Sequence, residues 1–117
     1  MKDGLYELFY RAASSPEGSF ESMMLVLRSG RILAADQWGG VYLGRCDYNA
    51  KTRNHHIDVQ FHIPEGGVLV TDDAPRQSAS HIHIDTDIGD GEGPTRIQID
   101  GREVIMTLKF KGPAPST

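Results

Sequence analysis

The sequence predicts an all-β protein, a small antiparallel up-and-down β-barrel of about eight strands. Apolar side chains recur at every second residue in most of its apolar runs, the period that places them on one face of a strand. Turns centred on glycine separate neighbouring runs at short intervals. A chain built this way can bury its apolar face only by closing a barrel or by packing one sheet on another, so a two-sheet sandwich is the alternative.

The first half of the chain contains four expected strands. Residues 5–11 and 41–47 alternate clearly. Residues 20–28 (FESMMLVLR) do not, and a helix competes with a strand there because Met and Leu are good helix formers. A two-residue turn ending in Gly30 follows at once, and residues 31–35 resume an extended pattern. Two extended runs around such a turn indicate a β-hairpin, so we expect a strand on each side of it.

The second half contains four longer runs and one short segment that we expect to be strands: residues 55–63, 68–71, 81–87, 95–100 and 103–111. The last two form a hairpin around Asp100 and Gly101, because both central residues of a type I′ turn need positive φ. Sequential strands usually neighbour each other, and closing such a meander removes its exposed edges. Residues 1–112 are therefore expected to form one barrel domain, with residues 113–117 as a flexible tail.

Composition excludes several classes of function. The 117 residues include 12 basic and 16 acidic side chains, a formal net charge of −4, which argues against direct binding of nucleic acid. The single cysteine, Cys46, cannot form an intrachain disulfide and fits a reducing cytoplasm. No apolar run approaches the roughly 20 residues of a membrane helix, and the first residues lack a signal-peptide core. We expect a cytoplasmic protein that has no membrane contact.

Four short motifs follow one another along the first half of the chain: residues 1–6 (MKDGLY), 29–31 (SGR), 34–36 (AAD) and 41–44 (VYLG). In this order they resemble the GrlR-like family, named for a negative regulator of type III secretion genes in enteric bacteria. The resemblance implies a lipocalin- or calycin-like barrel that pairs into a homodimer. It also implies a non-enzymatic regulatory role, exerted by binding a regulatory protein partner without any cofactor. Ala34 and Ala35 stand where the family tends to have two glycines.

Several residues are candidates for contact with a partner or ligand: Asp36, Trp38, Tyr42, Asp47, Asp87, Asp90 and Glu92. The regulator that names the family has an acidic run after the strand matched by residues 41–44, whereas residues 45–54 here contain one acid, Asp47. The acidic stretch that ends at Glu92 offers an alternative docking surface. Asp36 follows an apolar run, so its carboxylate either stabilises a turn or contacts a ligand. Trp38 either plugs one end of the barrel or lies in a dimer contact.

The five histidines raise the hypothesis of a metal site. Residues two apart on a strand project to the same side, so His81, His83 and Asp85 share one face and could hold an ion with help from a neighbouring strand. The simpler interpretation is that they are polar residues on the solvent face of a sheet. The sequence contains no serine-nucleophile, phosphate-binding or dinucleotide motif, so a metal-dependent barrel enzyme is the only catalytic alternative.

The barrel interior is a further candidate site. A small barrel is either filled by its own side chains or holds one small apolar ligand. The aromatic and sulfur side chains at the expected inward positions would line such a cavity: Tyr6, Tyr10, Phe61, Met106 and Phe110. For a chain of this length the sequence favours a filled interior, with an apolar-ligand carrier as the alternative function.

Overall fold

The computed structural model describes residues 2–16, 20–67, 77–89 and 93–113. Within these ranges the chain forms eight β-strands: β1 (Gly4–Ala12), β2 (Glu21–Arg28), β3 (Arg31–Ala35), β4 (Val41–Asn49), β5 (Asn54–Ile63), β6 (Ser80–Gly89), β7 (Thr95–Ile99) and β8 (Arg102–Gly112). In this part of the chain there is no helix long and apolar enough to cross a membrane. The all-β prediction is confirmed.

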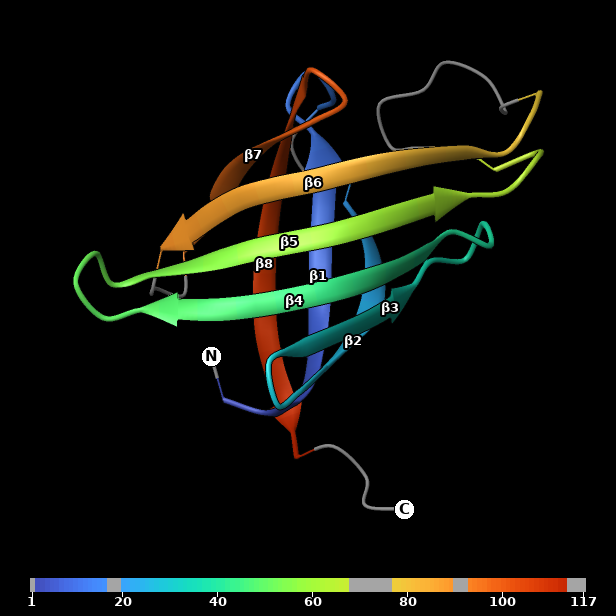
Figure 1. Cartoon of the computed structure of the whole chain (residues 1–117). Coiled ribbons are helices and arrows are strands. Elements are labelled where there is room, and N and C mark those ends of the chain that lie inside the picture. The colour runs from blue at the N-terminus through green and yellow to red at the C-terminus, as the bar shows by residue number, and fades with distance from the viewer. Residues whose placement is uncertain (1, 17–19, 68–76, 90–92, 114–117) are drawn as a thin grey trace.

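All eight strands belong to one sheet with the order β6-β5-β4-β3-β2-β1-β8-β7, and every pair of neighbours is antiparallel. The sheet rolls around so that β5 and β6 cross in front of β1 and β8 (Figure 1). The structure is therefore the predicted up-and-down barrel with a single seam. At that seam the edge strands β6 and β7 lie close together, but the described residues form no hydrogen-bonded ladder between them.

The segment for which a helix competed with a strand is strand β2. Met23, Leu25 and Leu27 are buried, whereas Met24 between them is exposed. The turn that follows has positive φ at both central residues, 50° at Ser29 and 77° at Gly30. This backbone belongs to a type I′ hairpin, which holds β2 against β3 and thereby favours the extended form over a helix. Asp100 and Gly101 adopt the same conformation, with φ of 52° and 76°, as the sequence predicted.

The core lies inside the barrel and is made by alternate residues of every strand. Its four most deeply buried side chains are Phe61, Leu27, Ile63 and Val104. Cys46 is buried with them, and burial raises the pKa of its thiol. Because the thiolate is the reactive form, burial disfavours reaction at Cys46, as expected of a core cysteine.

Gly44 allows β4 to approach β5 more closely than any other residue would. It occupies an inward position opposite Val59. A Cβ placed there would lie 2.6 Å from the Cα of Val59 and would overlap the carbonyl oxygen of Asp58. The obstacle is backbone rather than a movable side chain, so the wall of the barrel depends on glycine at this position.

Some predictions concern residues outside the described ranges. They are the short strand at residues 68–71, the tail from residue 114 onward, and the contact candidates Asp90 and Glu92.

Candidate functional site

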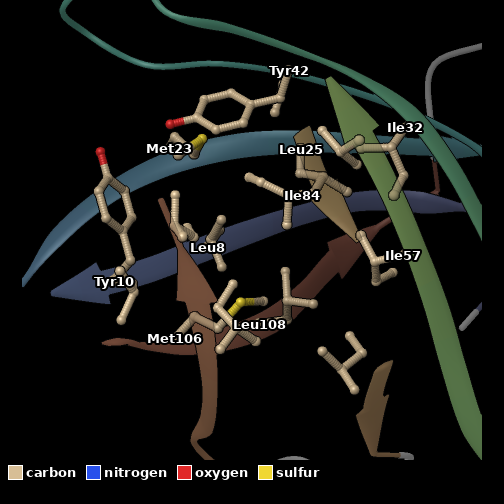
Figure 2. Close-up of a pocket in the computed structure, with 16 residues that line it drawn as sticks. Leu8, Tyr10, Met23, Leu25, Ile32, Tyr42, Ile57, Ile84, Met106 and Leu108 are labelled. Carbon is tan, nitrogen blue, oxygen red and sulfur yellow. The ribbon is translucent and has the colours of Figure 1, made fainter. Parts of the chain in front are cut away.

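The barrel encloses an apolar cavity of about 100 Å³, to which all eight strands contribute side chains (Figure 2). Leu8, Leu25, Ile57 and Leu108 are among the lining residues. The sequence favoured a filled interior, whereas the structure leaves this cavity, and Ala34 on β3 has the smallest side chain among the residues that line it. Apolar cavities of about 150 Å³ stay dry and admit benzene or xenon. The cavity in this barrel is smaller, so it suits a guest as small as a xenon atom.

Of the interior residues that the sequence proposed, Tyr10 and Met106 line the cavity. Tyr6 and Phe61 are buried beside it in the core. Phe110 is 40% exposed, at the end of β8, where its ring packs edge-on against that of Tyr6. Alternation alone placed Phe110 inside, but the barrel wall is already ending at that position.

Two tyrosines supply the polar groups at the cavity wall, and their hydroxyls lie on the same side of it (Figure 2). Tyr10 donates to Glu21 Oε2 at 3.4 Å, and Tyr42 donates to Asp36 Oδ2 at 3.4 Å. Burial, and after it the nearby carboxylates, raise the pKa of both phenols well above 10. Both groups are therefore neutral hydrogen-bond donors at physiological pH.

Asp36 organises the loop between β3 and β4. Its Oδ1 accepts the backbone N–H of Trp38 at 2.9 Å and that of Gly40 at 2.8 Å. The backbone N–H of Asp36 also donates to the carbonyl of Gly40 at 3.0 Å. The carboxylate thus stabilises a turn, which was one of the two roles that the sequence allowed. Trp38 stands on this loop with its side chain 47% exposed, so it does not plug the barrel.

The outer wall carries an exposed apolar surface across β1 to β4, here called the apolar outer face. Strand register aligns it in two rows, Leu5–Val26–Leu33–Leu43 and Met24–Ala35–Val41. Leu33 is 51% exposed and Leu43 is 55% exposed. At one end lies a basic row, Arg28–Arg31–Arg45, which forms a shallow groove with Val26, Leu33 and Leu43 of the first apolar row. A contiguous apolar patch rimmed by polar residues is typical of protein-binding surfaces.

Histidines and aspartates gather on the outer face of the β5–β6 hairpin. His83 Nε2 lies 2.6 Å from Asp58 Oδ1, and the closest ligand atoms of Asp58, His83 and Asp85 all lie within 4.8 Å of one another. The sequence grouped His81 with His83 and Asp85. In the structure His81 contacts His62 instead, and His62 Nδ1 lies 3.2 Å from His81 Nε2. The sequence did not group Asp58 with His83 and Asp85, because spacing along one strand does not show which residue of the next strand lies opposite.

The remaining contact candidates occupy separate places. Asp87 binds His56 Nδ1 at 2.7 Å, and this hydrogen bond raises the pKa of the His56 imidazole despite its exposure to solvent. Asp47 is exposed on β4, opposite His56. Tyr42 is half-buried at the cavity, with its ring stacked on that of Phe61 at 3.9 Å between centroids. These candidates therefore do not form a single site.

A scan of the sequence against protein-family models finds no match, and a search of curated proteins finds no relative. The resemblance to the GrlR-like family therefore remains a prediction.

Proposed function

We propose that this protein is a non-enzymatic cytoplasmic regulator of the GrlR-like type, which acts by binding proteins through its outer wall. The observation that carries the proposal is the apolar outer face. Its two rows leave large aliphatic side chains in solvent on a wall that the barrel does not need for its own core. The cavity is a weaker basis for function, because ligand pockets usually measure about 300–1,000 Å³.

The first occupant of the apolar outer face is a second copy of the chain. In a two-fold dimer each copy presents the same patch, so the face must complement itself. The basic row lies at one end of the face, and Glu7, which stands opposite Met24 and forms an ion pair with Lys111, lies at the other. An antiparallel arrangement keeps the basic rows of the two copies at opposite ends of the interface, which avoids repulsion between like charges. The regulatory protein then binds the dimer.

Light scattering at micromolar concentration is expected to give twice the 12.9 kDa of the chain. The double substitution Leu33→Glu and Leu43→Glu is expected to give the monomer, because it places two carboxylates in the centre of the buried patch. The control is Gln98→Glu, which adds a negative charge at an exposed position of β7, and it should remain dimeric. A wild-type protein of 12.9 kDa would contradict the dimer.

The regulatory part of the proposal is tested separately, by transcript profiling of the native host. Expression of the wild-type protein should change the transcript levels of a defined set of genes, and the double variant should not. Identical profiles with and without the wild-type protein would contradict a regulatory role, whatever the oligomeric state.

A second candidate function is the binding of a small apolar ligand, which the apolar cavity favours. Xenon should enter the barrel and shift its ¹²⁹Xe resonance, because the lining is apolar and of suitable size. Ala34→Leu, which adds three carbons at the inward position, should abolish the shift. Ala35→Leu, on the outer face of the same strand, is the matched control and should retain it. A wild-type protein without any shift would remove this candidate.

A further inference from the structure

The outer face of the β5–β6 hairpin has an unusual arrangement of charge. Register places four pairs of residues directly opposite each other: His56–Asp87, Asp58–Asp85, Gln60–His83 and His62–His81. Two of the eight residues, Asp58 and Asp85, are therefore carboxylates that face each other across the ladder. Like charges at directly opposed positions destabilise a sheet, so this pair favours positive charge close by. Arg45 on β4 stands directly opposite Asp58 on the same face.

Two histidines lie diagonally beside these carboxylates. His83 Nε2 is 2.6 Å from Asp58 Oδ1, and His56 Nε2 is 3.0 Å from Asp85 Oδ1. The ligand atoms of Asp58, His83 and Asp85 form a close group from the two adjacent strands, and His56 joins it from the next row through its contact with Asp85. Each side chain is about half exposed, which leaves room for the rotations that bring its donor atom toward a common centre.

The donor set matches the preferences of Zn²⁺, which takes imidazole nitrogen and carboxylate oxygen in tetrahedral sites. Bonds of about 2.0–2.1 Å in a tetrahedron place the ligand atoms roughly 3.4 Å apart. The corresponding atoms of Asp58, His83 and Asp85 already lie within 4.8 Å of one another. Small side-chain rotations therefore suffice for these three ligands, and His56 Nε2 lies 3.0 Å from Asp85 Oδ1 at the side of the group. The paired strands hold the backbone in place meanwhile.

Asp87 supplies a further feature of metal centres. Its Oδ1 binds His56 Nδ1 at 2.7 Å, which leaves His56 Nε2 to face Asp85. A carboxylate that holds one imidazole nitrogen while the other binds the metal is the usual second layer of zinc sites, since it fixes the tautomer and orients the ring.

We propose that the outer face of the β5–β6 hairpin binds one Zn²⁺ ion through His56, Asp58, His83 and Asp85, with Asp87 as the positioning residue for His56. The bound ion neutralises the opposed carboxylates and joins β6, an edge strand of the sheet, to β5. Zinc should therefore stabilise the fold as well as bind to it.

The test titrates ZnCl₂ into tag-free protein by calorimetry at pH 7.5. We expect one ion per chain and a rise in the melting temperature that grows with zinc concentration. His83→Gln should lower the affinity at least tenfold, because it removes a ligand. Asp87→Asn should lower it about tenfold while the stoichiometry stays at one, since it loosens the support of His56 and removes no ligand. Circular dichroism without zinc checks that both variants keep the strand spectrum.

The matched control is His62→Gln, which removes a histidine from the same face of the same hairpin. Its ring contacts His81 and lies outside the four-residue set. It should bind zinc within about twofold of the wild-type affinity. The proposal is overturned if the wild-type protein binds no zinc, if His62→Gln weakens binding as much as His83→Gln, or if His83→Gln binds with unchanged affinity.

Discussion

Substitution of Gly44 by alanine is expected to lower the free energy of unfolding by about 3 kcal/mol. A Cβ at this position would lie 2.6 Å from the Cα of Val59, so β4 and β5 must move apart. Both strands are held by ladders on either side, and the displacement would strain hydrogen bonds across the wall. Small domains have only about 5–15 kcal/mol of stability in total, so the variant retains a fraction of it.

Urea denaturation of Gly44→Ala against the wild-type protein measures this effect, with a matching fall of at least about 10 °C in melting temperature. Gly89→Ala is the control, because a Cβ at Gly89 meets nothing within 4 Å. We expect the control to differ from wild type by less than about 0.5 kcal/mol. Equal stability of the two variants would show that β4 and β5 do not approach each other as closely as described.

Substitution of Phe61 by alanine is the second prediction with a large effect, a loss of about 3–5 kcal/mol. Phe61 is 0% exposed, and its ring stacks on Tyr42 with an interplanar angle of 9°. Its loss would leave a void at the end of the core and would release Tyr42, whose hydroxyl reaches Asp36 in the β3–β4 loop. Burial and stacking both disappear in this variant.

Chemical denaturation checks the prediction for Phe61, and Gln60→Ala provides the comparison. Gln60 precedes Phe61 on β5 but is exposed, so its truncation should change the free energy of unfolding by less than about 1 kcal/mol. A loss below about 1.5 kcal/mol for Phe61→Ala would contradict the packing of this part of the core.

Local patterns predicted the strands because each strand has one buried face and each hairpin has its own turn chemistry. The segment around Met23 shows how this works. Its composition permits a helix, but the turn at Ser29 and Gly30 requires an extended partner for β3. Information of this kind lies within a few residues along the chain, so it could be read from the sequence.

The cavity and the zinc-ligand set depend on information that local patterns do not contain. Cavity volume is the small difference between the space inside a barrel and the side chains that fill it, and one methyl group at Ala34 affects that difference. The ligand set depends on cross-strand register, which places Asp58 opposite Asp85 and His81 opposite His62. Spacing of residues within one strand places them on a face without identifying their neighbours.

The barrel wall does not resist opening equally at every position, because β6 and β7 meet at a seam. Elsewhere, opening the barrel requires breaking a ladder of backbone hydrogen bonds, whereas at the seam the two edges lie close together without such a ladder in the described part of the chain. Ile84 and Ile97, one from each edge, both line the interior cavity. Thermal fluctuations that open the barrel should therefore concentrate between β6 and β7. Such openings give xenon a route into the cavity while the other strand pairs stay intact.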